Sequence, residues 1–438
     1  MTVETLGLIV SRISSLVFWA VVLITLVRIC IGGGVSIAFV EKLWEKAKQI
    51  AKPVFSESFT EICNVFIFGL AVRLFIFTIG FFLLIENSPT IESLFHSFRG
   101  WDSAFYIDIA ALGYEENLYV YGEIRNVRLV FFPLYAFLIR LLNPMFGDYW
   151  NTAYVVSMLA FNFGLCYMYK LVKRDFGKSV AWWSIVFLSF APPAFFFGTP
   201  MTESLMILTS AASLYYLRTH KWALAGLFGA LCMLTRMVGF ILIVVALVEF
   251  ITHYKIFGLV QKREWKQIFN FVFTKGIFIA LIPVGGLIYL YINWQVSGDP
   301  FRFMYYQSAV WHNTTQYFGQ TIIDQFNIIA RDSGSQVARQ IHIPNVLAFM
   351  ISIVLLAYAL KKNIHYTYVV YSLGYTFVSF APSWLLSGAR YMVACVPLFV
   401  FMGNYAEKKP LHGTIILIVS FMGMITLLRI FLSGGFIL

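Results

Sequence analysis

The sequence predicts an all-α, polytopic membrane protein with about twelve transmembrane segments. Of its 438 residues, 60% are hydrophobic and only 12% are charged, whereas soluble domains carry about 25% charged residues. The apolar residues gather in stretches of roughly 20, the length of a helix that crosses a bilayer. This composition excludes a soluble enzyme, a disordered chain and a nucleic-acid binder.

Ten apolar stretches are each expected to cross the membrane once. They lie at 8–31, 62–86, 152–172, 179–197, 202–218, 275–294, 344–360, 365–383, 390–405 and 411–432. The stretch 222–251 is too long for one span and carries Arg236 and Gly239 at its centre, so we expect two short helices that form a hairpin. Trp19, Arg28 and the lack of a small-residue cleavage site indicate that 8–31 is a retained span.

The lysines set the orientation of these segments. All sixteen, from Lys42 to Lys409, fall on one side of the threading, which is the cytoplasmic side by the positive-inside rule. This pattern requires 129–146 to lie along the outer surface as an amphipathic helix, because a span there would move Lys173 and Lys178 outside. The formal charge of +11 is therefore a topology signal and needs no nucleic-acid partner.

We divide the chain into two regions. Residues 1–60 hold the first span and an amphipathic stretch, 39–52, which is expected on the inner surface. Residues 61–438 form the core, with two large outer loops at 87–151 and 295–343. Loops of this length are usually functional or disordered, and their many aromatic residues argue against disorder.

Asp102 is the candidate catalytic residue of the first outer loop. It follows Trp101 soon after the span 62–86 ends, so its carboxylate is expected at the membrane–water boundary. There it could act as a general base on an acceptor hydroxyl. The alternative is that Asp102 caps a helix beginning at Ser103, because aspartate is a favoured N-cap.

Three charged residues, Glu203, Arg236 and Arg390, belong to the outer half of the membrane. A charge buried in a membrane marks a functional site by default, and arginines there could hold a phosphate through paired N–H donors. The alternatives are structural ion pairs, for instance of Glu203 with an arginine, or a snorkelling Arg390. Arg73, in the middle of a span, is expected to have a structural role beside an acid.

The remaining polar residues indicate no cofactor. Gln307 and Trp311, in the second outer loop, could line a sugar pocket. A divalent cation is not required, although Asp102, Glu115 and Glu203 offer oxygen ligands. The five cysteines form no CxxC pair.

Several motifs, in order along residues 62–405, resemble the PIG-V family of mannosyltransferases. They are Trp101-Asp102-Ser103 with Tyr106, Ile109-Ala110 and Gly113-Tyr114; Phe131-Phe132-Pro133-Leu134-Tyr135; Thr202-Glu203-Ser204-Leu205; Leu234-Thr235-Arg236 with Gly239; and Ala389-Arg390-Tyr391 with Pro397-Leu398-Phe399. The chain departs from the family in the segment before residue 60. It also has Met237-Val238 where the family has Ser or Pro followed by any residue.

The resemblance implies a GT-C glycosyltransferase fold, with an active site on the exoplasmic side of the plasma membrane or the endoplasmic reticulum. Such enzymes transfer a sugar, here mannose, from a polyprenyl-phosphate carrier to a lipid- or glycan-linked acceptor with inversion. Asp102 becomes the candidate base, and Arg236 and Arg390 the candidate contacts of the carrier phosphate. The remaining candidate pocket residues are Trp101, Tyr114, Glu115, Glu203 and Tyr391.

Two other functions remain open. A flippase or transporter of lipid-linked sugars would explain the spans and the intramembrane arginines. However, the sequence shows no half-symmetry of the kind found in many transporters. A non-catalytic scaffold of a membrane complex would leave the motifs unexplained.

Overall fold

The computed structural model describes every residue except 1, 36–57, 85–88, 116–117, 121–122 and 436–438. The expected surface helix at 39–52 lies outside the described residues. The described chain is helical, as predicted, apart from one short antiparallel hairpin of β1 (Leu118–Val120) and β2 (Glu123–Arg125). The predicted all-α architecture is confirmed, and this hairpin is a local exception within the first loop.

Six helical segments are long and apolar enough to cross a membrane, which identifies a multi-pass membrane protein. They are α1 (Val3–Gly32), α3 (Phe59–Leu83), α7 (Tyr149–Phe176), Gly276–Ser297 including α14 (Leu281–Ser297), Ala338–Lys361 including α17 (Ile343–Lys361), and α21 (Pro410–Leu432). The predicted count of about twelve segments is not confirmed.

The other apolar stretches form shorter helices. They are α8 (Lys178–Ser189), α9 (Glu203–Arg218), α10 (Trp222–Thr235), α11 (Ile241–His253), α18 (Tyr366–Ser379) and α20 (Val396–Lys408). At 1.5 Å per residue these helices are roughly 18–24 Å long, less than the roughly 30 Å of a bilayer core. Among them, α9 packs on α7 and α10, and α8 packs on α20.

The predicted hairpin at 222–251 is confirmed. The chain breaks at Arg236, whose backbone is extended (φ −155°, ψ 149°), and a 3-10 turn, η4 (Met237–Phe240), then leads into α11. Gly239 lies so close to the end of α10 that a Cβ there would come within 2.6 Å of the Met233 nitrogen. At the other end of the hairpin, Trp222 Nε1 donates to Tyr254 Oη at 3.1 Å.

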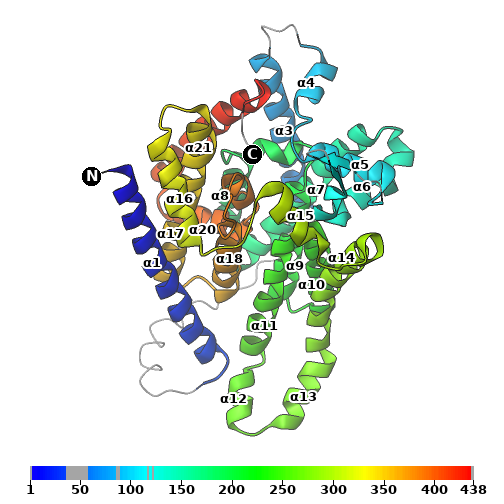
Figure 1. Cartoon of the computed structure of the whole chain (residues 1–438). Helices are drawn as coiled ribbons and strands as arrows, with labels where there is room; N and C mark the ends of the chain where they lie inside the picture. Colours follow the sequence, from blue (N-terminus) through cyan, green and yellow to red (C-terminus); the bar gives the residue numbers. More distant parts are fainter. Residues whose placement is uncertain (1, 36–57, 85–88, 116–117, 121–122, 436–438) are drawn as a thin grey trace.

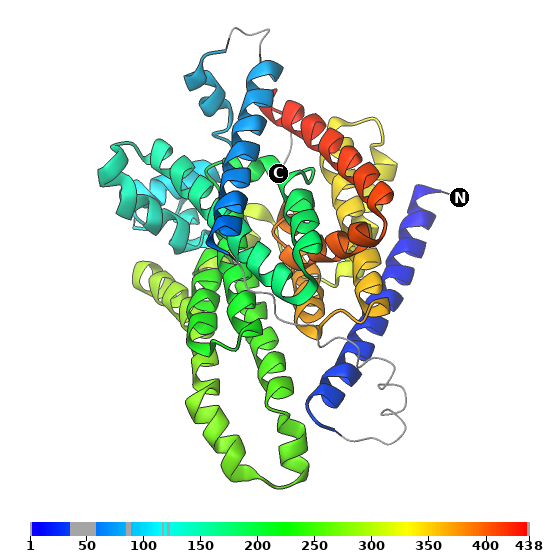
Figure 2. The same cartoon turned by 180° about the vertical axis from the view of Figure 1, so that it is seen from behind.

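The two large loops contain helices of their own. The first holds α4 (Ile91–Ser97), α5 (Ser103–Leu112) and α6 (Pro133–Phe146), and the second holds α15 (Arg302–Trp311) and α16 (Phe318–Arg331). Figures 1 and 2 show α4 at one end of the molecule, with α5 and α6 to one side of the bundle. The hairpin of α12 (Ile256–Gln261) and α13 (Trp265–Thr274) protrudes at the opposite end.

The helix predicted at 129–146 is observed as α6, preceded by a 3-10 turn at Val127–Val130. Its two faces differ, as expected of an amphipathic helix next to a bundle. Tyr135 and Ile139 are buried, whereas Phe137 and Leu141 are exposed. The buried face packs against α5 and α7.

Arg73 is structural, but the expected acidic partner is wrong. Its guanidinium donates to the carbonyl oxygens of Ala194, at 2.6 Å, and Ser189, at 3.0 Å. These carbonyls belong to the end of α8 and the 3-10 turn η3 (Ala194–Gly198), where the helix leaves carbonyl groups without helical partners. The guanidinium also lies 4.4 Å from the centre of the Phe161 ring.

Candidate active site

Four charged side chains from separate parts of the sequence meet in one line, which we call the charge cluster: Asp102, Arg390, Glu203 and Arg236. Arg390 Nη2 donates to Asp102 Oδ2 at 2.7 Å, and Arg390 Nε lies 3.3 Å from Glu203 Oε1. Arg236 Nη2 donates to the same Glu203 oxygen at 2.6 Å. All four were site candidates from the sequence, and the structure brings them together.

Each member of the cluster lies where a helix begins or ends. Asp102 directly precedes α5, and Glu203 is the first residue of α9. Arg236 is the extended residue after α10, and Arg390 lies in the short helix α19 (Gly388–Met392). Because these positions interrupt helices, their side chains can converge on one point from four different elements.

Asp102 does not cap α5, so the capping alternative is wrong. Its side chain makes no capping hydrogen bond, because Arg390 takes the carboxylate instead. The preceding Trp101 has a positive φ of 55°, a conformation that is rare for a bulky residue. Such strained residues gather at functional sites, and this one fixes the direction in which the chain enters α5.

The cluster is buried in its middle, at Arg390 and Glu203, and more exposed at its two ends. The side chains of Glu203, Arg390, Arg236 and Asp102 are 0%, 3%, 16% and 35% exposed, respectively. Two cations and two anions balance, which offsets the large cost of burying each charge alone. The structural ion pair expected for Glu203 is therefore present, whereas snorkelling of Arg390 is wrong because its side chain turns inward. Asp102 is the most exposed member of the cluster.

Tyr391 lies against both guanidinium groups. The centre of its ring is 4.8 Å from Arg236 Cζ and 5.5 Å from Arg390 Cζ, within the range of cation–π contacts. Tyr375 Oη donates to the Tyr391 carbonyl oxygen at 3.0 Å. The aromatic ring thus fixes the positions of the two arginines relative to each other.

A group of aromatic residues lies beside the cluster. The ring of Tyr106 packs against the rings of Phe131 and Tyr135, with centroids 5.3 Å and 5.4 Å away. Trp311 meets Phe131 at 6.3 Å, and Tyr114 Oη donates to the Phe131 carbonyl oxygen at 2.6 Å. Burial raises the pKa of both Tyr106 and Tyr114, so their hydroxyls stay protonated.

Two of the candidate residues do not reach the cluster. Gln307, near the end of α15, accepts hydrogen bonds from Asn313 through its backbone and side-chain oxygens. Glu115 is exposed, at the edge of the β hairpin. In the described part of the chain, no hydrogen bond joins Gln307 to the charge cluster, and Glu115 forms no ion pair with either arginine.

Two ligands of the arginines were not singled out from the sequence. Thr202 Oγ1 accepts from Arg236 Nε at 2.9 Å, and Met201 Sδ accepts weakly from Arg390 Nη1 at 3.4 Å. Both directly precede Glu203, in the Pro200–Glu203 segment. Their position next to Glu203, a predicted buried charge, is the sequence feature that could have identified them.

The acids do not assemble into a cation site. Within the described ranges, no three His, Cys, Asp or Glu side chains are placed to hold a metal ion. Asp102 and Glu203 both face Arg390, and Glu115 lies apart from them.

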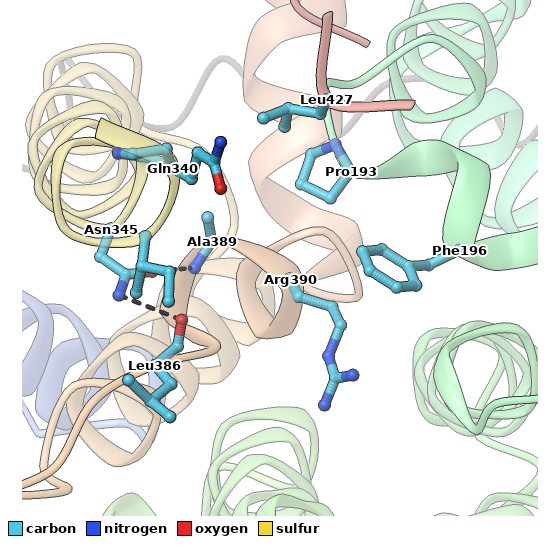
Figure 3. A pocket seen from close by; sticks show the side chains of 10 residues that line it. Pro193, Phe196, Gln340, Asn345, Leu386, Ala389, Arg390 and Leu427 are labelled. Atoms are coloured by element: carbon cyan, nitrogen blue, oxygen red, sulfur yellow. Dashed lines mark hydrogen bonds between the residues drawn. The ribbon is translucent and has the colours of Figure 1, made fainter. Parts of the chain in front are cut away.

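A small cavity lies behind Arg390, between α17, α19 and η3 (Figure 3). It encloses about 10 Å³, about the room that one water molecule needs. Asn345 holds the turn that carries Arg390, because its Oδ1 accepts from the Ala389 nitrogen at 2.9 Å. The Arg390 side chain points away from Gln340 and Leu427, the residues on the far side of this cavity.

Comparison with known protein families finds a match for part of this chain. Residues 132–289 match the family described as dolichyl-phosphate-mannose-protein mannosyltransferase. The match includes Glu203 and Arg236 and covers roughly a third of the chain. It supports a membrane glycosyltransferase of the GT-C class, and it does not single out the PIG-V family. Among curated proteins, none matches this chain in sequence.

Similar solved structures include ArnT from Cupriavidus metallidurans bound to undecaprenyl phosphate. It is 14% identical, with a TM-score of 0.46 over 78% of this chain and 59% of that one. The archaeal oligosaccharyltransferase AglB from Archaeoglobus fulgidus, in complex with an inhibitory peptide and a dolichol-phosphate, is 11% identical, with a TM-score of 0.42 over 84% of this chain. This chain spans 55% of that oligosaccharyltransferase.

Proposed function

We propose that this protein is an integral membrane glycosyltransferase. It moves a sugar, mannose, from a polyprenyl-phosphate carrier to a hydroxyl of a glycolipid or glycan acceptor, with inversion. The observation that carries the proposal is the charge cluster. In it one half-buried carboxylate pairs with a buried arginine, and this arginine also pairs with a second carboxylate, which is held in turn by a second arginine. The family match over residues 132–289 supports the same reaction class.

Asp102 is the proposed general base, because it is the most exposed acid of the cluster. The acceptor oxygen attacks the anomeric carbon of the donor while Asp102 takes the hydroxyl proton. The bond from that carbon to the phosphate oxygen breaks, and polyprenyl phosphate leaves with the bonding electrons. General-base catalysis of this kind typically contributes 10²–10⁴-fold to a rate.

The arginines are the proposed phosphate contacts. Arg236 uses Nε and Nη2 for Thr202 and Glu203, so Nη1 is the donor that its described contacts leave for a ligand. Arg390 Nη2 donates a hydrogen bond to Asp102. A phosphate that binds Arg390 Nη2 would compete with the Asp102 carboxylate. Guanidinium groups that are preorganised by their protein contacts stabilise the negative charge that develops on the leaving phosphate.

The remaining pocket assignments follow from position. Trp101, Tyr114, Trp311 and Tyr391 are proposed to border the sugar. Gln307 and Glu115 are proposed to contact the substrate from the two outer loops, away from the charge cluster. The active site is proposed to face the exoplasmic side, because all sixteen lysines are assigned to the opposite side.

The test is a transfer assay with the purified full-length protein, radiolabelled polyprenyl-phosphate mannose and a set of lipid-linked and glycan acceptors. Labelled product that depends on Asp102 supports the proposal. If sealed vesicles take up the labelled carrier without forming product, the protein is a flippase or transporter. If neither product nor uptake is seen, the glycosyltransferase proposal fails and the scaffold remains.

A further inference from the structure

A groove separates α3 and α7 on the side of the bundle away from the charge cluster. It holds about 320 Å³, which is within the range of ligand-binding pockets. Its walls are Phe59, Ile62, Cys63 and Phe66 from α3, and Phe163, Cys166, Tyr167 and Lys170 from α7. These positions recur at the three- and four-residue spacing that puts side chains on one helix face, so two stripes face each other.

The groove is closed and apolar at its deep end. The rings of Phe66 and Phe163 meet there with centroids 5.3 Å apart. Beyond them the helices touch, because a Cβ on Gly69 would lie 2.2 Å from Asn162 Oδ1. From Phe163 to Lys170 the helix advances about 10 Å, so the groove has one apolar end and one charged end.

Lys170 is the charged end, and it has no acidic partner in the described part of the chain. Its Nζ lies 5.9 Å from the centre of the Tyr215 ring. The nearby acid, Glu61, is already paired with Lys173, and Lys178 lies 3.3 Å from its other oxygen. Among the residues that the structure describes, three lysines and one glutamate therefore give this mouth a positive charge.

We propose that this groove binds an anionic phospholipid of the leaflet on the lysine side. One acyl chain fills the groove as far as Phe66 and Phe163, and the headgroup phosphate contacts the Lys170 ammonium. The positive mouth favours a net negative headgroup over a zwitterionic one, as basic pockets between transmembrane helices do at the cytoplasmic face. The charge cluster lies toward the other end of α7, near Ser157, whose Oγ is 3.4 Å from the Met201 carbonyl oxygen. The lipid site is therefore independent of the proposed reaction.

The experiment is native mass spectrometry of the full-length protein in detergent, titrated with phosphatidylglycerol or phosphatidylcholine. Wild type is expected to retain phosphatidylglycerol in preference to phosphatidylcholine. Lys170→Ala should weaken phosphatidylglycerol binding about fivefold, equivalent to about 1 kcal/mol for one basic residue, and leave phosphatidylcholine unchanged. Cys63→Trp, which fills the groove, should reduce the binding of both lipids.

Lys361→Ala is the matched control, because Lys361 is an exposed lysine at the end of α17 on the same side of the molecule. It should bind phosphatidylglycerol as wild type does. Each variant is compared at equal thermal stability, and Lys170→Gln replaces Lys170→Ala if alanine lowers that stability. Equal retention of the two lipids by wild type overturns the proposal. The proposal is also overturned if the Lys170 variant keeps the wild-type preference for phosphatidylglycerol. The same holds if Lys361→Ala loses as much phosphatidylglycerol binding as the Lys170 variant does.

Discussion

Replacing Asp102 with asparagine distinguishes a general-base role of this residue from a purely structural one. The amide keeps the shape of the side chain but cannot take a proton. The geometry makes the substitution mild for folding. An asparagine oxygen can still accept from Arg390 Nη2, which is 2.7 Å from the carboxylate oxygen, and Arg390 Nε keeps Glu203 at 3.3 Å. The expected cost is about 1 kcal/mol, the difference between a hydrogen bond to a charged acceptor and one to a neutral acceptor.

The expected effect on the reaction is far larger. If Asp102 removes the acceptor proton, the transfer rate should fall by about 10²–10⁴-fold, while binding of the carrier phosphate is kept because both arginines remain. Asp108→Asn is the matched control. Asp108 lies in α5, the helix that Asp102 directly precedes. Its side chain is 42% exposed, and it pairs with Arg128, whose side chain is 2% exposed, at 3.2 Å. The Asp108–Arg128 pair thus resembles the Asp102–Arg390 pair, in which Asp102 is 35% and Arg390 3% exposed, but it is not part of the charge cluster.

The assay is sugar transfer at saturating carrier and acceptor, with each variant at matched expression and thermal stability. Asp102→Asn should be nearly inactive, and Asp108→Asn should keep most of its activity. The reasoning is refuted if Asp102→Asn stays within about threefold of wild type, well short of the range for a lost base, or if the two variants lose activity equally.

Three further predictions concern the arginines, the buried acid and the topology. Arg236→Lys should lose most of its turnover, since a single ammonium cannot replace a fork that holds two partners. Arg140→Lys should stay close to wild type, because the described hydrogen bonds of Arg140 go to the backbone carbonyls of Ala110 and Ile109. Comparable turnover in the two lysine variants would argue against a phosphate clamp. Glu203→Gln should lower the free energy of unfolding by about 3 kcal/mol, as breaking a buried ion pair does; an unchanged melting temperature would contradict this. In a background without native cysteines, a cysteine at Asp332 should react with an impermeant maleimide only from the exoplasmic side, and one at Lys262 only from the cytoplasmic side. The reverse pattern would invert the topology.

The sequence predicted the break at Arg236 because a charge and a glycine interrupt an apolar run, and the structure places the break there. It also named all four members of the charge cluster. Glu203, Arg236 and Arg390 are conspicuous as charges in apolar segments, and Asp102 follows a tryptophan soon after a span ends. It did not predict how they pair. Whether Arg390 meets Asp102, Glu203 or both depends on the path of α19, which local pattern does not encode. The predicted number of membrane-crossing helices stays unconfirmed, because several apolar stretches form helices shorter than a bilayer core.

The order in which the charge cluster is synthesised bears on how the chain enters the membrane. Glu203 is followed by its partner Arg236 only 33 residues later, so this pair can form while α9 and α10 insert, and neither charge need cross alone at a cost of about 2.5–3.5 kcal/mol. Asp102 must instead wait for Arg390, which is 288 residues further along the chain. A nascent chain that stops before α19 therefore contains both α10 and α11 but has an Asp102 carboxylate without its arginine partner. The charge cluster is complete only when α19, which carries Arg390, has been added. A protein truncated before α19 should therefore insert into the membrane but lack an assembled site.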